Sequence, residues 1–509
     1  MTPGTAERTV AHWAKVIDQT RCIGCHACTT ACKSENLVPL SVTRTYVKYV
    51  DIGEFPQARR AFQVTRCNQC DDAPCTHACP TGAMFRRPDG IVDFDKSICI
   101  GCKACIAACP YDAIFINPDD HSAEKCNFCA HRVDSGLEPA CVVVCPTEAI
   151  LIGDLNDPDS KVAQIVNRDV VNVRRPEKET RPKLFYKGAH QATLDPIAAR
   201  RPGGGLFMWS EQGRVKHGVT SGHPKEWNNA ASAVLSYDVP HRMPWDWRVS
   251  LYTWTKAIAA GVYLVPLLLI LTGAATWTNP LWLYATPLLG LVFLAITGAL
   301  LIWDLEHPKR FLMIFTRPHW RSWLVRGAFI IAGYSVLLVL HFLGGFFGFP
   351  NMVRAMALAG VPLAAGTAVY TAYLFAQSKA RDLWQNPLLA PLMLVQALLA
   401  GAAALLPIAI PIGGSTLTAL LWVVTLTSIV HVLFIFFELT MVHGTAHARL
   451  AVWEMTRGRY AAIFWIGMIG LLSGLATVVV GPIAALPALL GMLLYEHAYV
   501  QAAQAVPLA

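Results

Sequence analysis

The sequence predicts a multidomain chain in which a cysteine-rich α+β domain precedes an all-α membrane domain of eight helices. Two observations support this prediction. All sixteen cysteines of the 509 residues lie between residues 22 and 145, and the residues after 250 form nearly continuous apolar runs. A chain of this length is also expected to form more than one domain. We therefore expect a cysteine-rich domain at residues 1–150, an extended linker at 151–245 and a transmembrane domain at 246–509.

The cysteines form four groups of four. Groups one and three have the spacing C-x2-C-x2-C-x3-C, group two has C-x2-C-x4-C-x3-C, and group four separates its two pairs by eleven residues. In chain order the groups are Cys22, Cys25, Cys28 and Cys32; Cys67, Cys70, Cys75 and Cys79; Cys99, Cys102, Cys105 and Cys109; and Cys126, Cys129, Cys141 and Cys145. The regular spacing is that of bacterial ferredoxins, in which the fourth cysteine binds the other cluster of a pair.

Disulfides and zinc are the alternative uses of these cysteines. Thiols two residues apart are too close for independent disulfides, and residues 1–20 lack the apolar core of an export signal. Zinc ribbons also use paired cysteines, but without the third cysteine and the Cys-Pro ending found here. Short runs of β-branched residues beside the groups, such as GIVDF and AIFI, favour a duplicated ferredoxin-like α+β iron–sulfur domain.

The charge and the linker add two expectations. The formal net charge of +8 is compatible with nucleic acid. However, four clusters with four thiolates each would carry about −2 apiece and cancel that excess, and the sequence has no nucleic-acid-binding motif. Residues 151–245 contain Pro, Gly and Arg with no clear period, which predicts an extended tail.

Eight apolar runs after residue 250 are long enough to cross a membrane, since a crossing takes roughly 20 residues. They lie at about 251–273, 281–303, 322–343, 355–376, 388–411, 416–440, 461–480 and 482–503. Lys and Arg cluster in the loops on the side of the cysteine domain, whereas the opposite loops contain only Arg354. This asymmetry predicts a multi-pass protein of a bacterial or archaeal cytoplasmic membrane with the cysteine domain on the cytoplasmic side.

Two segments of the membrane domain share a similar sequence pattern. The second run ends in IWDLEHPKRF and the sixth in FFELTMVHGTAHARL, each placing an acid before His and Arg at the same face. This pattern predicts two related four-helix halves.

Residues 13–190 resemble the four-cluster iron–sulfur subunits of molybdopterin oxidoreductases, such as polysulfide, dimethyl sulfoxide and nitrate reductases. The resemblance implies that group one pairs with group four and group two with group three. The implied ligand sets are Cys22, Cys25, Cys28 and Cys145; Cys32, Cys126, Cys129 and Cys141; Cys79, Cys99, Cys102 and Cys105; and Cys67, Cys70, Cys75 and Cys109. Some relatives have Trp in place of Cys102, so its presence here implies four [4Fe–4S] clusters. The last set would lie nearest the membrane.

The membrane domain resembles the polysulfide reductase membrane-subunit (NrfD-like) family. The matching segments are WDLEHPKRF, RPHWRSW, AVYTAYLF and DLWQNP, and the resemblance covers residues 241–450 well. It implies that a quinone, either menaquinone or ubiquinone, binds at the face that touches the iron–sulfur subunit, and that no haem is present. His341 and His431 would also differ in depth by roughly 15 Å, too much to hold one haem iron.

A quinone site needs a few polar groups in an apolar slot. Tyr370, whose phenol can donate to a carbonyl, is the first candidate, followed by Asp246 between two tryptophans and by the intramembrane cation Lys256. Asp304, His307 and Arg310 crowd the end of the second run. The alternative is that Tyr370 is only an interface anchor and that Asp304 only pairs with a nearby arginine.

We therefore expect an electron-transfer and membrane-anchor subunit, a component of an oxidoreductase complex rather than its catalytic subunit. It would pass electrons between a molybdopterin (Mo or W) catalytic partner, acting on an inorganic sulfur compound, and the membrane quinone. One alternative is a subunit of a respiratory quinol-oxidising complex, similar to alternative complex III, that passes electrons to cytochromes. A secondary transporter with a ferredoxin regulator would explain the two halves, but it gives the sixteen ligands no role.

Overall fold

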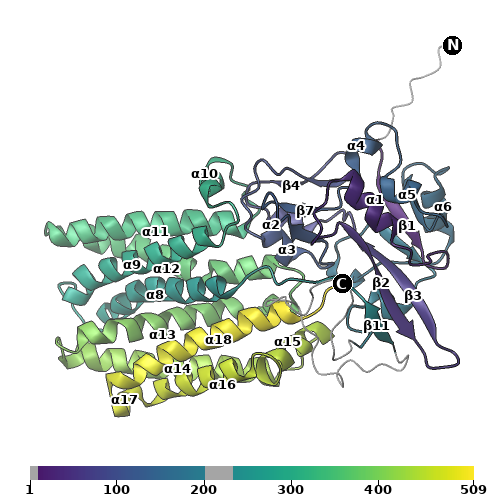
Figure 1. Cartoon of the computed structure of the whole chain (residues 1–509). Coiled ribbons are helices and arrows are strands. Elements are labelled where there is room, and N and C mark those ends of the chain that lie inside the picture. Colours follow the sequence, from purple (N-terminus) through teal and green to yellow (C-terminus); the bar gives the residue numbers. More distant parts are fainter. Residues whose placement is uncertain (1–9, 201–232) are drawn as a thin grey trace. The chain divides into compact units, whose positions relative to one another are not determined.

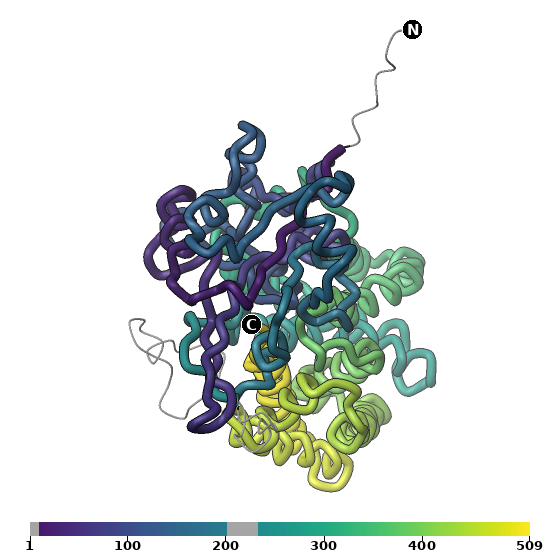
Figure 2. The backbone as a smooth tube through the Cα atoms, turned by 90° about the vertical axis from the view of Figure 1, so that its right-hand side faces the viewer, coloured from purple at the N-terminus to yellow at the C-terminus, as the bar shows by residue number. Residues whose placement is uncertain are grey.

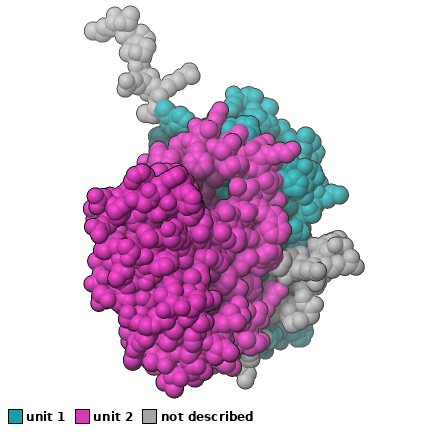
Figure 3. Space-filling model, turned by 90° about the vertical axis from the view of Figure 1, so that its left-hand side faces the viewer, with its two compact units in different colours: residues 1–244, 507–509 teal, residues 245–506 magenta. Residues whose placement is uncertain are grey.

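The computed structural model describes residues 10–200 and 233–509. The chain divides into two compact units, coloured separately in Figure 3. Unit 1 comprises residues 1–244 with 507–509, and unit 2 comprises residues 245–506. This boundary falls where the apolar runs begin, so the cysteine-rich and membrane parts of the sequence form separate bodies (Figure 1).

A four-stranded sheet joins the two ends of the cysteine-rich part. Its order is β8 (Ile150–Asp154), β1 (Trp13–Asp18), β10 (Leu184–Lys187) and β9 (Val171–Asn172). Strand β1 pairs antiparallel with β8 and parallel with β10. One face of β1 packs against helix α6 (Lys161–Arg168) through buried alanine and valine side chains. The purple and blue segments of this unit therefore run beside one another in Figure 2.

Residues 151–187 differ from the extended linker that the sequence predicts. Strands β9 and β10 and helix α6 all lie in this stretch, together with a 3₁₀ turn at Pro176–Lys178 and, shortly after, helix α7 (Gln191–Leu194). The two strands are only two and four residues long, and Pro, Arg and Lys surround them. Such short elements show no readable period, and they form because β1 offers both edges for pairing.

The rest of unit 1 repeats a helix-and-hairpin pattern around the cysteines. Helix α2 (Pro74–Ala78) precedes the hairpin of β4 (Met84–Arg86) and β5 (Val92–Phe94), and α3 (Ala104–Ala108) precedes β6 (Ile114–Ile116) and β7 (Ala123–Lys125). Helix α1 (Ala27–Glu35) and the short α4 (Ala130–Val133) and α5 (Ala140–Val143) follow cysteines of groups one and four. Helices α2 and α3 end just before a Cys-Pro pair, since proline cannot continue a helix. This arrangement confirms the predicted α+β iron–sulfur fold.

A second sheet completes unit 1. Its order is β11 (Val234–Tyr237), β2 (Thr45–Ile52) and β3 (Arg59–Arg66), with antiparallel pairing throughout. The hairpin of β2 and β3 ends at Arg66, which lies opposite Thr45 and directly precedes the cysteine Cys67. This register carries the end of β3 into the cysteine groups.

Unit 2 contains eight helical segments that are long and apolar enough to cross a membrane, which confirms the predicted eight-helix domain. They are Trp247–Leu271 (α8), Leu281–Trp303 (a π-helical turn and α9, Thr286–Trp303), Trp323–Phe346 (α11), Pro350–Gln377 (α12), Leu389–Ala409 (α13), Gly414–Thr440 (α14), Ala461–Val480 (α16, Ala461–Ser473, and α17, Thr477–Val480) and Pro482–Ala505 (a 3₁₀ turn and α18, Ala485–Ala505). Two short helices, α10 (Met313–Thr316) and α15 (Ala446–Thr456), lie between them.

Helices α8 and α13, the first helices of the two predicted halves, lie in the core of unit 2. Helix α8 contacts α9, α12, α13 and α18. It meets α13 at a pair of glycines, Gly261 and Gly401. A Cβ atom at Gly261 would lie 1.8 Å from the carbonyl oxygen of Ala397, so the two backbones touch. Small residues permit this close approach in membrane helices.

Candidate functional site

Two of the four predicted ligand sets surround cavities. One cavity is lined by Cys79, Cys99, Cys102 and Cys105, and the other by Cys22, Cys25, Cys28 and Cys145. Each set draws its members from two groups of the sequence, and each match agrees with the pairing that the resemblance implies.

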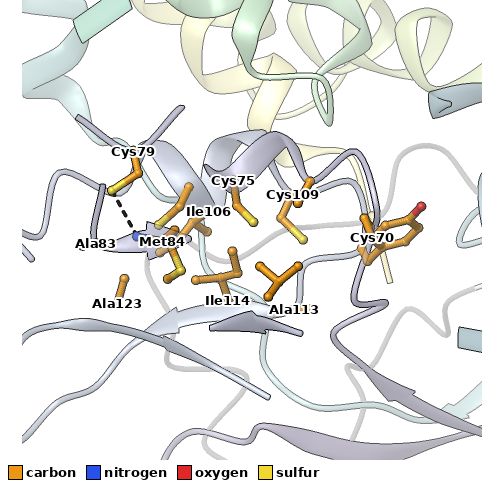
Figure 4. Packing of buried hydrophobic residues seen from close by; sticks show 14 of the residues in the cluster. Cys70, Cys75, Cys79, Ala83, Met84, Ile106, Cys109, Ala113, Ile114 and Ala123 are labelled. Atoms are coloured by element: carbon orange, nitrogen blue, oxygen red, sulfur yellow. Dashed lines mark hydrogen bonds between the residues drawn. The ribbon is translucent and has the colours of Figure 1, made fainter. Parts of the chain in front are cut away.

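The other two sets are also close together. Cys75 interacts electrostatically with Cys67, Cys70 and Cys109, and Cys32 does so with Cys126, Cys129 and Cys141. Figure 4 shows the thiols of Cys75 and Cys109 near each other among the apolar side chains that the two hairpins and helices bury. The fold therefore groups all sixteen thiols as the sequence predicts, and their role as ligands remains a prediction.

The surroundings of the sulfur atoms fit iron–sulfur clusters. Backbone N–H groups of Met84, Ala123 and Ala149 donate to the sulfurs of Cys79, Cys99 and Cys145 over 3.4, 3.4 and 3.2 Å. The first of these bonds is drawn in Figure 4. Donors aimed at cysteine sulfur stabilise the negative charge that a ligating thiolate carries.

Buried cations accompany the thiols. Arg66 is 1% exposed and donates from Nη1 to the Cys141 sulfur over 2.9 Å, while Lys15 is 3% exposed. Among residues 10–200 and 233–509, Nε and Nη2 of Arg66 and Nζ of Lys15 find no hydrogen-bond partner. Because an isolated buried cation costs several kcal/mol, these side chains need nearby negative charge. Four thiolates around a cluster would provide it.

The pKa values of the cysteines depend on how close each thiol lies to these buried cations. Burial raises the pKa of Cys28 to about 11 and that of Cys32 to about 12. Burial also acts to raise the pKa of Cys126 and Cys141, but Lys15 and Arg66 outweigh it, so the pKa of each lies below its ordinary value. Cys126 and Cys141 are therefore more readily ionised than Cys32.

In unit 2, two of the predicted quinone residues meet in the buried core. The Lys256 Nζ donates to the Ala368 carbonyl over 3.0 Å and to Thr371 Oγ1 over 2.7 Å, and it lies 4.8 Å from the centre of the Tyr370 ring. Glu496, also buried, lies within electrostatic range of Lys256 and accepts a hydrogen bond from Thr253. These residues come from α8, α12 and α18 and form the Lys256 cluster, defined as Thr253, Lys256, Tyr370, Thr371 and Glu496.

The Lys256 cluster lies at one depth in the bundle. Lys256 is nine residues from the start of α8 and Glu496 is nine from the end of α18, which places each about 14 Å from its helix end. Tyr370 is seven residues from the end of α12, or about 10 Å. In a bundle of eight crossings these three ends share one face, so the helices bring the side chains to the same level.

The remaining candidates lie at the helix ends. Asp246 caps α8 and pairs with Arg248 over 2.8 Å, and Arg248 approaches Asp304 at 3.5 Å. His307 and Arg310 follow in the loop after α9. Asp246 lies ten residues before Lys256, about 15 Å along the helix. The structure therefore separates the candidates into a buried cluster and a group at the helix ends. Arg248 is a partner of Asp304 that the sequence did not suggest.

Sequence reasoning missed Glu496, Thr253 and Thr371. Glu496 carries a readable signal, since a carboxyl within an apolar run is costly and usually functional. The two threonines carry none, because their role depends on which helices pack together. His341 contacts Trp282 with tilted rings whose centres lie 4.5 Å apart, while His431 lies against Tyr495 in the other half.

Comparison with known proteins identifies three family models along the sequence. Residues 13–34 match the 4Fe-4S binding domain, residues 59–155 the 4Fe-4S dicluster domain, and residues 236–492 polysulphide reductase, NrfD. A tetrathionate reductase subunit of Salmonella typhimurium is 43% identical over 196 residues, covering 37% of this chain and 77% of that protein. A polysulfide reductase subunit of Wolinella succinogenes is 42% identical over 176 residues, covering 34% and 92%. A putative dimethyl sulfoxide reductase iron–sulfur subunit of Halobacterium salinarum is 39% identical over 222 residues, covering 38% and 85%.

Proposed function

Because the protein belongs to the polysulphide reductase NrfD family and also carries 4Fe-4S domains, we propose that it carries electrons between a molybdopterin-type catalytic subunit and the membrane quinone pool. The observation that most supports this proposal is that one polypeptide contains both a cysteine-rich unit and a membrane unit. Unit 1 gathers sixteen thiols into four sets, and unit 2 has eight candidate membrane helices with a buried polar cluster.

The four ligand sets of unit 1 would each hold a [4Fe–4S] cluster, which supplies a one-electron carrier when bound. The chain's own contribution is the protein environment. Backbone N–H groups donate to the ligand sulfurs, and Arg66 and Lys15 place positive charge beside Cys141 and Cys126. Buried apolar side chains pack around the thiols of groups two and three.

The Lys256 cluster is the proposed quinone site. Quinone chemistry needs donors to the carbonyl oxygens and groups that exchange protons. The Tyr370 hydroxyl and the Lys256 ammonium are donors, and two of the three N–H bonds of Lys256 already reach Ala368 and Thr371, which leaves one for a ligand. Glu496, held by Thr253, provides a carboxyl that gives or accepts a proton.

The names of the relatives suggest the partner's substrate. They include tetrathionate and polysulfide reductases, so an inorganic sulfur compound is the proposed substrate of the catalytic subunit. The Lys and Arg pattern of the membrane loops supports a cytoplasmic position for unit 1.

Two measurements test the proposal. Metal analysis of the purified complex should give molybdenum or tungsten with a large co-purifying subunit, whereas co-purifying c-type haem would favour the quinol-oxidising alternative. Quinol-dependent turnover should then fall at least tenfold in K256M and in E496Q, while turnover of the catalytic partner with a soluble dye stays unchanged.

The matched control for these variants is T297V. Thr297 is equally buried and polar, but its hydroxyl bonds to Thr255 and to the Phe293 carbonyl. T297V should keep quinol turnover near that of the original protein. Full quinol turnover in both K256M and E496Q would place the quinone elsewhere.

A further inference from the structure

Arg66 occupies an unusual place between two ligand sets. It is the last residue of β3, and its side chain is almost fully buried. The guanidinium donates to the sulfur of Cys141 and also interacts electrostatically with Cys28 and Cys126. Cys126 and Cys141 belong to the predicted set with Cys32 and Cys129, which we call the Cys141 set. Cys28 belongs to the neighbouring set, which we call the Cys28 set.

Lys15 adds a second positive charge on the side of the Cys141 set. Its ammonium lies 4.0 Å from the centre of the Phe128 ring and has no hydrogen-bond partner in the part of the chain that the structure describes. The charges that act on Cys126 and on Cys141 include Lys15 as well as Arg66. Phe128 follows Cys126 by two residues, so Lys15 is held over the backbone turn that presents this cysteine.

Neither cation is neutralised by a carboxylate within ion-pair distance, so far as the described residues show. Arg44 offers the contrast. It is also buried near this set and bonds to Asn36 and Asn127, but it pairs with the buried Glu124 at 2.5 Å. The charge of Arg44 is therefore compensated within the protein, and the charges of Arg66 and Lys15 are not.

Uncompensated positive charge beside a cluster stabilises the added electron and raises the reduction potential. Both Arg66 and Lys15 act on the Cys141 set, and Arg66 touches its sulfur directly. Arg66 also acts electrostatically on Cys28 of the Cys28 set, but its hydrogen bond to sulfur goes to Cys141. The two cations therefore favour reduction of one neighbour over the other.

We propose that Arg66, supported by Lys15, sets the reduction potential at the Cys141 set and makes it easier to reduce than the Cys28 set. This inference rests on the proposed function, because it presupposes [4Fe–4S] clusters at both sets. Arg66 acts through its positive charge and is not a cluster ligand. It would determine whether an electron resides at the Cys141 set or at the Cys28 set.

The test is a redox titration followed by EPR on the full chain in its complex. The signal of the Cys141 set is identified as the one lost in C129S. In R66Q this signal should move to lower potential with the iron content unchanged. R66K keeps the charge and should show a smaller shift, and K15M should lower the potential of the same signal.

The control is R174Q. Arg174 is as deeply buried as Arg66, but it lies over Tyr111 and donates to the Leu508 carbonyl rather than to a cysteine. R174Q should shift the reduction potential of the Cys141 set clearly less than R66Q does. An equal shift would show a general effect of charge and would overturn the role of the Arg66–Cys141 contact.

Two further outcomes separate the inference from the proposed function. Unmoved potentials in an iron-replete R66Q refute the inference. If R66Q loses iron, K15M becomes the test of the inference. An unshifted potential of the Cys141 set in K15M then refutes the inference as well. Iron far below about sixteen atoms per chain in the unsubstituted protein counts against the proposed four-cluster function instead.

Discussion

The contact between Gly261 and Gly401 makes a sharp prediction about the membrane unit. In G261A the new methyl group would start 1.8 Å from the Ala397 carbonyl oxygen and 2.7 Å from the Gly401 nitrogen. Both obstacles are backbone atoms, which cannot rotate away as a side chain does. The substitution must therefore separate α8 from α13.

The size of the effect follows from these distances. Real Cβ contacts are essentially never shorter than 3.0 Å, so the helices must separate by about 1.2 Å at this point. Overpacking costs about 1–3 kcal/mol, and a fixed backbone obstacle puts G261A at the upper end. At ~2–4 °C per kcal/mol for a domain of about 150–250 residues, which is close to the size of unit 2 at residues 245–506, the melting temperature should fall by roughly 6 to 12 °C.

The assay is thermal unfolding of the purified protein in detergent, with G298A as the control. Gly298 lies in α9, and a Cβ atom there would meet nothing within 4 Å. Alanine should be neutral or slightly stabilising at this position, because it is a better helix former than glycine. A melting temperature of G261A equal to that of G298A would refute the close packing of α8 and α13.

Two further predictions concern unit 1. Replacing Cys70 with Ala should remove about four iron atoms per chain and abolish quinone reduction, while the catalytic partner keeps its activity with soluble dyes. If quinone reduction is retained, electrons must leave unit 1 from another ligand set. His241 is the second case: burial acts to lower its pKa, but the carboxylates of Asp238 and Asp112 outweigh burial and raise the pKa to about 9. Protonated His241 therefore stabilises the folded unit fully below the ordinary pKa of about 6.5, and about 3 kcal/mol is lost as the pH rises through 9. The free energy of unfolding should fall over this range in the original protein and stay flatter in H241Q; equal pH profiles would contradict the linkage.

The features that the sequence predicted well are those carried by continuous patterns. Each of the eight apolar runs matches a helical segment, with ends within a few residues, because twenty consecutive apolar residues have few other stable arrangements. The cysteine spacing within each group was also readable as a cluster-binding pattern, since ligand spacing is a local property that the Cys-Pro pairs reinforce. Which groups share a ligand set was implied only by the family resemblance.

The features that were missed depend on contacts between distant residues. Strand β10 is four residues long and pairs along its whole length with β1, about 170 residues earlier. Glu496 and Lys256 come from the last and first membrane helices, and no pattern along the sequence relates them. Arg66 directly precedes Cys67, so the sequence already indicates a charge beside a ligand, but only the fold shows that its guanidinium contacts Cys141.

The parallel pairing of β1 with β10 has a consequence for biogenesis. Lys15 lies opposite Leu184, so the sheet cannot close until residue 184 has left the ribosome. All sixteen cysteines precede that point, the last at Cys145. At ~5–20 residues per second, synthesis of the intervening 39 residues takes roughly 2–8 s. During that interval one edge of β1 is open and every thiol has already been made, so all sixteen thiols exist before the strand that packs over Cys28 and Cys141 can join the sheet.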